Sequence, residues 1–132
     1  MRIRLALLTA GAAVLLAAVP VVAHHSFAAE FDAAKPIKLT GVVTKVEWMN
    51  PHAYFYIDVS EEGKVSNWAL EMGSPNGLMR QGWTRNSMKI GETVTVEGSR
   101  AKDGSLVGNA RSVILVSTGQ RLFAASSQTP NP

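Results

Sequence analysis

The chain has 132 residues, of which 46% are hydrophobic, and it contains no cysteine. Disulfides, thiolate metal sites and a lipid-anchored lipoprotein are therefore excluded. The formal charge of +3 comes from 13 basic and 10 acidic residues, and the lysines and arginines are spread singly, so neither nucleic acid nor a membrane surface is an expected partner.

The first 23 residues have the order of a secretory signal peptide. Arg2 and Arg4 precede an apolar run from Leu5 to Val19, and small residues follow it. This run of about fifteen residues is shorter than the roughly twenty that cross a bilayer as a helix, so a retained anchor is the weaker alternative. We expect a periplasmic or secreted protein with no transmembrane anchor after cleavage.

Cleavage is expected after Ala23, because Ala23 and Val21 supply the small side chains that the signal peptidase needs. A cut near Ala17 or Ala18 is the competing alternative. Removal of residues 1 to 23 from the 132-residue chain would leave 109, enough for one compact domain. Two of the 13 basic residues leave with the signal, so 11 basic residues face 10 acidic ones and the net charge falls to +1.

The remaining sequence is β-rich with one helical interruption. Apolar and polar residues alternate in five segments, which we predict to be the strands Ile37–Trp48, His52–Val59, Lys64–Met72, Thr93–Arg100 and Asn109–Val116. Between the third and fourth, Ser74 as a cap and Pro75 at the first position predict a short helix that includes Gly77 to Gly82. This order predicts an all-β fold with one short helix, a small five-stranded Greek-key barrel like the oligonucleotide/oligosaccharide-binding (OB) fold.

The expected organisation places an OB-like domain between two less regular segments. A signal peptide (1–23) is followed by a tether (24–36), the domain itself (37–123) and a polar, disordered tail (124–132). Phe27 and Phe31 are the only anchors in the tether. Whether they dock decides whether the mature N-terminus has a fixed position.

Cleavage after Ala23 would make His24 and His25 the first two residues of the mature protein. An N-terminal histidine offers a metal its α-amine and its imidazole together, and both lose their protons readily near neutral pH. Nitrogen ligands without thiolates suit copper(II), nickel or zinc, and the Irving–Williams order favours copper. We therefore predict a metal site of His24, His25 and His52, with copper as the candidate cofactor, and this start resembles the histidine-brace copper proteins in that one feature.

Two simpler interpretations of these histidines stay open. His24 and His25 could merely follow a cleavage site, and His52 could be a turn histidine whose ring bonds the backbone after Asn50 and Pro51.

The second predicted strand has two distinct faces, since side chains on a strand alternate. Ala53, Phe55, Ile57 and Val59 are expected in the core, which leaves His52, Tyr54, Tyr56 and Asp58 on the other face. On the third strand, Trp68, Leu70 and Met72 are expected to point inward, which leaves Asn67, Ala69 and Glu71 beside the tyrosines.

The outward face of the second strand is a candidate binding surface, because ligands of such barrels often lie across the second and third strands. Its predicted ligand-binding residues are Trp48, Tyr54, Tyr56 and Asp58. The alternatives are that the tyrosines only pair across strands for stability and that Trp48 belongs to the core.

Five segments of the chain together resemble a known family. They are Ala23–Phe27, Trp48–His52, Gly73–Asn76, Gly82–Thr84 and Ala101–Ser105. They resemble a family of small exported bacterial proteins that is classed only as a domain of unknown function, over nearly the whole mature chain. The resemblance implies no established activity, substrate or cofactor.

Three classes of function remain. The protein could bind a metal, it could bind a small molecule, glycan or peptide on its aromatic outer face, or it could dock through a strand edge on another exported or membrane protein. We do not expect an enzyme, because the sequence has no cysteine nucleophile, no Gly-x-Ser-x-Gly elbow, no His-Glu-x-x-His helix and no phosphate loop. The native metal or ligand, the partner and the oligomeric state stay open.

Overall fold

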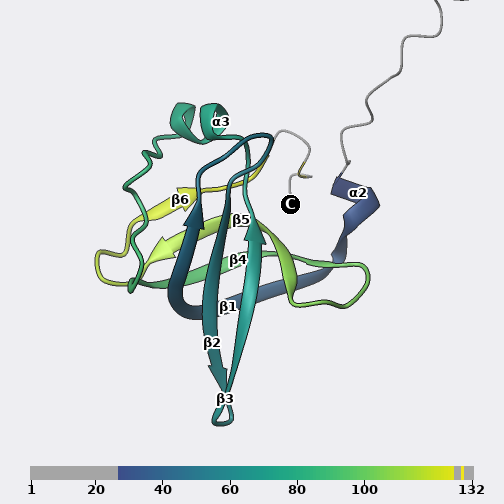
Figure 1. Ribbon diagram of the computed structural model, residues 1–132. Coiled ribbons are helices and arrows are strands. Elements are labelled where there is room, and N and C mark those ends of the chain that lie inside the picture. Colours follow the sequence, from purple (N-terminus) through teal and green to yellow (C-terminus); the bar gives the residue numbers. More distant parts are fainter. Residues whose placement is uncertain (1–26, 127–128, 130–132) are drawn as a thin grey trace, which may run out of the picture.

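The computed structural model describes residues 27–126 and residue 129 (Figure 1). This part of the chain is mostly β, as predicted, but it holds six strands and two short helices where five strands and one helix were expected. In chain order the elements are α2 (Phe27–Glu30), β1 (Phe31–Glu47), β2 (Tyr54–Glu61), β3 (Lys64–Glu71), α3 (Pro75–Arg80), β4 (Thr93–Ala101), β5 (Val107–Leu115) and β6 (Arg121–Phe123).

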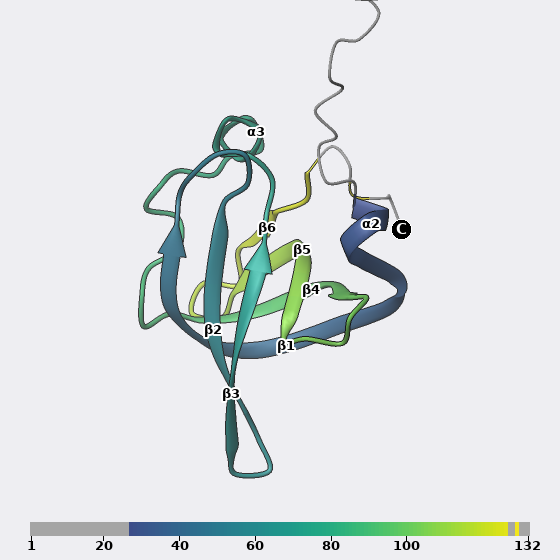
Figure 2. The same cartoon turned by 45° about the vertical axis from the view of Figure 1, so that its right-hand side comes forward.

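The strands form one sheet in the order β3-β2-β1-β4-β5-β6, with antiparallel neighbours. A further parallel pairing joins β3 to β5, where Ala69–Glu71 lies beside Val107–Asn109. The pairings of β1, β2, β3, β5 and β4 therefore close on themselves. The 17-residue β1 makes this possible because its first part pairs only with β4 and its last part with β2. Figure 2 shows it curving from α2 on the right across to the left of the view, where it turns upward.

Residues 27–36 of the expected tether form a short helix and the first part of β1, while its first three residues lie outside the described part of the chain. Phe31 and Asp32 pair with Ala101 and Arg100 of β4, so the strand begins six residues before the predicted Ile37. Both tether phenylalanines dock: their ring centroids lie 5.7 Å apart, and they are buried in a small cluster with Ala101 and Val107. Burial of two aromatic rings outweighs the weak strand pattern of residues 31–36.

The main core takes residues from all six strands. The predicted inward residues of β2 and β3 are all buried, which confirms the alternation: Ala53, Phe55, Ile57, Val59, Trp68, Leu70 and Met72. Leu78 of α3 and Trp83 belong to the same core. The indole Nε1 of Trp83 donates a 2.9 Å hydrogen bond to the carbonyl oxygen of Phe123 in β6, so the polar group of this buried ring is satisfied.

The helix after β3 begins as predicted. The Ser74 hydroxyl accepts a 3.1 Å hydrogen bond from the Gly77 amide, and Pro75 occupies the first turn. The helix ends at Arg80, two residues before the predicted end at Gly82, which lies at φ 97°. No helix among the described residues is long and apolar enough to cross a membrane.

The first residues of the expected disordered tail are instead held against the sheet. Ala124 is buried, its amide donates to the carbonyl of Arg111 at 2.9 Å, and its carbonyl accepts from the Gly73 amide at 2.8 Å. Further on, the Thr129 hydroxyl donates to Oδ1 of Asn109 at 3.1 Å. The backbone contacts of Ala124, which a polar composition does not reveal, continue the pairing begun by β6.

Candidate functional site

One row of polar side chains crosses four strands on the outer face of the sheet. Glu47 of β1 lies opposite Tyr54 of β2, Tyr54 lies opposite Glu71 of β3, and Glu71 lies beside Asn109 of β5. Residues opposite each other on paired strands point to the same face, so these four side chains share one face of the sheet. The row lies next to His52, two residues before Tyr54 on the same face.

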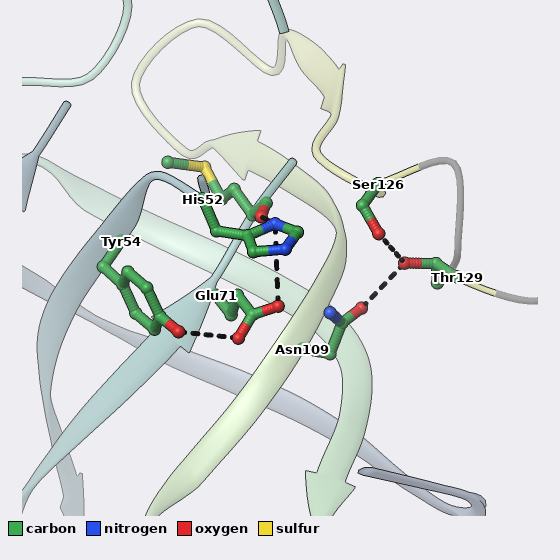
Figure 3. A network of polar contacts seen from close by, with 7 residues as sticks. His52, Tyr54, Glu71, Asn109, Ser126 and Thr129 are labelled. Atoms are coloured by element: carbon green, nitrogen blue, oxygen red, sulfur yellow. Dashed lines mark hydrogen bonds and ion pairs between the residues drawn. The ribbon is translucent and has the colours of Figure 1, made fainter. Parts of the chain in front are cut away.

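His52, Tyr54 and Glu71 form the cluster that we take as the candidate site (Figure 3). The Tyr54 hydroxyl donates a 2.6 Å hydrogen bond to Oε2 of Glu71, and Oε1 of the same carboxylate lies 3.7 Å from Nδ1 of His52. Glu71 is 7% exposed, unusually little for a carboxylate. A buried acid stays in place only with polar partners, and Tyr54 and His52 are two of them.

The imidazole of His52 is oriented by the backbone. Its Nδ1 lies 3.0 Å from the carbonyl oxygen of Met72. A carbonyl can only accept, so this contact is a hydrogen bond when Nδ1 carries the proton. In the neutral ring the lone pair is then on Nε2. The simpler interpretation of His52, a ring bonded to the backbone, therefore accounts for Nδ1 only. It does not engage Nε2, which could bind a ligand.

The environment of Tyr54 favours its neutral phenol. Burial raises the pKa of Tyr54 far above its ordinary value of 10.0, and the hydrogen bond to Glu71 and the charge of Glu71 raise it further. The negative charge of Glu30 in α2 acts in the same direction. Helix α2 thus brings a second carboxylate into the field of the cluster.

Tyr56, predicted beside Tyr54 in the binding face, is engaged elsewhere. Its ring lies under the Lys45 ammonium, which is 5.2 Å from the ring centroid, and its hydroxyl contacts Oε2 of Glu47 at 3.5 Å. Lys45 forms an ion pair with Glu47, and this hydrogen-bonded pairing raises the pKa of Lys45. Lys45, Glu47 and Tyr56 are therefore a group of their own.

The structure separates the other predicted ligand-binding residues from the cluster. Oδ1 of Asp58 accepts a 2.9 Å hydrogen bond from the amide nitrogen of Asn67. Trp48 is half-buried and packs against the main core. Of the four predicted binding residues, Tyr54 alone takes part in the cluster with His52, while His24 and His25 lie outside the described residues.

Glu71 is the residue that sequence reasoning placed on the correct face but did not assign to the site. Alternation put it beside the tyrosines, and a carboxylate opposite Tyr54 was the available signal. Its low exposure could not be seen in the sequence, because it depends on the parallel pairing with β5. Asn109 was missed for the same reason.

The cluster by itself is an incomplete metal site. Among residues 27–126 and 129, no group of three or more histidine, aspartate or glutamate side chains could hold a metal ion. His52 supplies one imidazole, and a metal would need further donors from outside this part of the chain. The described chain starts at Phe27, and the three residues from His24 to Phe27 span at most about 11 Å.

Comparison with known proteins identifies a family whose function is unknown. The model of a family of unknown function (DUF6152) matches residues 12–110, a range that includes His24, His25 and the whole cluster. No curated protein matches the chain.

Proposed function

The chain belongs to DUF6152, a family of unknown function, and we propose that it is an exported copper-binding protein. The metal would be held by His24 and His25 at the mature N-terminus together with His52. The observation that carries the proposal is the 3.0 Å contact between Nδ1 of His52 and the carbonyl of Met72.

That contact is the arrangement found around metal-binding histidines. Such a histidine usually donates its second ring N–H to a backbone carbonyl or a carboxylate, which fixes the ring and leaves the other nitrogen as the ligand. His52 has both partners, with the Met72 carbonyl at 3.0 Å and Oε1 of Glu71 at 3.7 Å. The His52 side chain is 22% exposed, so it stays accessible to an incoming ion.

The docked start of the described chain supports the second half of the proposal. Phe27 and Phe31 pack on Ala101 and Val107, and the Lys102 amide donates to the carbonyl of Glu30 at 2.9 Å. Val107 pairs with Ala69, two residues before Glu71, so α2 is anchored beside the strand that carries the cluster. A short chain from Phe27 would then hold the α-amine and imidazole of His24 at high effective concentration near His52.

The scaffold of this proposal is an OB-like barrel. The closed sequence of pairings through β1, β2, β3, β5 and β4, with α3 between β3 and β4, fits a five-stranded Greek-key barrel to which β6 adds a short strand. Export rests on the signal-like residues 1–23, with a periplasmic or secreted location as the consequence.

The alternative is a ligand-binding or protein-docking module that uses the face of Trp48, Tyr54, Tyr56 and Asp58 without metal. It has less support, because Tyr56 and Asp58 already contact Lys45, Glu47 and Asn67. It predicts that substitutions in this face alter ligand binding and that substitutions of the histidines do not.

The test uses untagged protein that starts at His24, titrated with copper(II) and examined by native mass spectrometry and electron paramagnetic resonance. We expect one copper per chain and a spectrum with several nitrogen ligands. His52→Ala and protein acetylated at the α-amine of His24 should each lose at least about tenfold in affinity. Acetylation keeps every imidazole and removes the α-amine as a ligand, so it tests the N-terminal chelate alone.

Tyr56→Phe is the matched control, since it alters the same outer face without touching a proposed ligand. Its copper affinity should equal that of the wild type. Failure of the wild-type protein to retain stoichiometric copper would contradict the proposal, as would a native cleavage site other than the one after Ala23.

A further inference from the structure

One dipeptide of α3 combines the sequence and the exposure that favour a spontaneous reaction of the backbone. Asn76 is followed by Gly77 in the first turn of the helix, and the Asn76 side chain is exposed. Glycine has no side chain that would shield its amide nitrogen or restrict rotation of the peptide. The Gly77 nitrogen can therefore attack the side-chain amide of Asn76, and no other asparagine in the sequence precedes a glycine.

We propose that Asn76 is a deamidation site and that the Ser74 cap controls its rate, independently of copper binding. In this reaction the Gly77 nitrogen forms a bond to Cγ of Asn76 while the Cγ–Nδ2 bond breaks. Nδ2 leaves as ammonia and takes the proton of the Gly77 amide. Water then opens the cyclic imide at either of its carbonyl groups, which gives aspartate or isoaspartate at position 76 without any oxidant or reductant.

The hydrogen bond of the cap opposes the first step. The Gly77 amide donates to Oγ of Ser74 at 3.1 Å, so its hydrogen points toward Ser74. In the planar cyclic imide, Cγ of Asn76 takes the place of that hydrogen. The peptide between Asn76 and Gly77 must therefore rotate before the ring can close, and the rotation breaks the cap hydrogen bond.

Contacts next to this peptide keep the turn in place. The Leu78 amide donates to the carbonyl oxygen of Ser74 at 2.9 Å, and the Leu78 carbonyl accepts from the Trp83 amide at 3.0 Å. The Leu78 side chain is buried in the main core. A helix of six residues depends on such contacts more than on its own propensity. The reaction then proceeds from the fraction of molecules in which the first turn is open.

The two products would change α3 in opposite directions. Aspartate at position 76 adds a negative charge to a first turn that has no acidic residue, where the helix dipole favours one. Isoaspartate adds a methylene group to the backbone, so the ring closed by the hydrogen bond from Leu78 to Ser74 gains an atom. That product loosens the helix and the packing of Leu78.

The experiment incubates the protein at mildly alkaline pH, folded and in urea, and follows each asparagine by trypsin digestion and mass spectrometry. Asn86 is the internal control, because it is exposed, precedes Ser87 and is separated from Asn76 by cleavage after Arg80 and Arg85. In urea Asn76 should deamidate faster than Asn86, and folding should slow Asn76 at least about tenfold. Equal rates at Asn76 in the folded and unfolded protein would overturn the proposal.

Variants of Ser74 test the cap itself. In the folded protein Ser74→Ala should raise the rate at Asn76 about fivefold, because loss of an N-cap increases the open fraction by about that factor. Ser74→Asp keeps a side-chain acceptor and should stay near the wild-type rate. In urea the three proteins should react alike, and Asn86 should be unaffected throughout. A wild-type rate in folded Ser74→Ala would overturn the role of the cap. If Ser74→Ala does not fold by circular dichroism, the comparison of folded and unfolded wild type still decides the proposal.

Discussion

The Tyr54 hydroxyl and the Glu71 carboxylate are joined by a 2.6 Å hydrogen bond between residues directly opposite each other on β2 and β3. The second oxygen of the same carboxylate faces His52 at 3.7 Å. The Glu71 carboxyl group therefore connects the Tyr54 phenol to the His52 imidazole, and a shift of one of these rings would affect the other through it. The outer face of the sheet is ordered at this point by side chains as well as by backbone pairing.

Removal of the Tyr54 hydroxyl should destabilise the protein. Tyr54→Phe leaves the buried Glu71 without one of its donors, and a hydrogen bond to a charged group contributes about 1.5–3 kcal/mol. The free energy of unfolding in urea should fall by that amount. Tyr56→Phe is the control, because its 3.5 Å contact with Glu47 is at the limit of a hydrogen bond and should cost less than about 0.5 kcal/mol. Equal losses in the two variants would contradict the assigned role.

Stability should also fall at alkaline pH in the metal-free protein. Because the folded state raises the pKa of Tyr54 above its ordinary value of 10.0, it holds the phenol proton where the unfolded chain releases it. The contribution of Tyr54 is then fully present below pH 10 and is lost as the pH rises above it. Urea unfolding at several pH values should show this decline in the wild type and a weaker one in Tyr54→Phe.

A direct titration can separate Tyr54 from the other tyrosine. The sequence has two tyrosines, so in Tyr56→Phe the tyrosinate absorbance reports Tyr54 alone. Folded Tyr56→Phe should titrate above pH 10, and the same variant in urea should return to the ordinary value. Titration at the ordinary value in the folded state would show that the phenol is not held by Glu71.

Local sequence patterns predicted those features of the fold that depend on residues close together in the sequence. The inward faces of β2 and β3, the Ser74 cap and Pro75 all follow from local patterns, and each is found in the structure. Two of the three cluster residues, His52 and Tyr54, were predicted as site residues, and Glu71 was placed only on their face. Its burial results from the pairing of β3 with β5, between residues about 38 positions apart.

Strand β4 approaches its antiparallel neighbour β5 closely at Gly98, and this should make the position intolerant of a side chain. A Cβ there would overlap the carbonyl oxygen of Asn109, which is backbone and cannot move aside. Gly98→Ala should therefore lower the free energy of unfolding by about 3 kcal/mol. Gly119 has open space around it and φ 73°, so Gly119→Ala should cost only about 1 kcal/mol of backbone strain. A loss at Gly98 no larger than at Gly119 would contradict the observed strand approach.

Phe27 should matter for copper binding as well as for stability. Phe27→Ala removes a buried ring from the cluster with Phe31 and Ala101, which would free α2 from the sheet. We expect a loss of about 3 kcal/mol in unfolding free energy and, if the N-terminal site is correct, weaker copper binding. Phe123→Ala is the matched control, since that ring is 60% exposed. Unchanged copper affinity in folded Phe27→Ala would show that the docking of α2 does not position the chelate.

The segments around the sheet were the hardest to predict because their order comes from distant contacts. Residues 31–36 have little strand pattern, yet Phe31 and Asp32 pair with β4, and β6 is only three residues long. Ala124 and Thr129 carry no local signal at all, and their contacts with Gly73 and Asn109 become possible only after the sheet has formed.

The attachment of Ala124 to Gly73 also governs how this protein can be engineered. The chain leaves the sheet at Ala124 to Ser126 close to Gly73, one residue after Met72, whose carbonyl contacts His52. A polyhistidine purification tag fused beyond this segment would bring foreign imidazoles to the same end of the molecule. Copper taken up by such a fusion would measure the tag together with the protein, and a cleavable tag removed before metal analysis avoids the artefact.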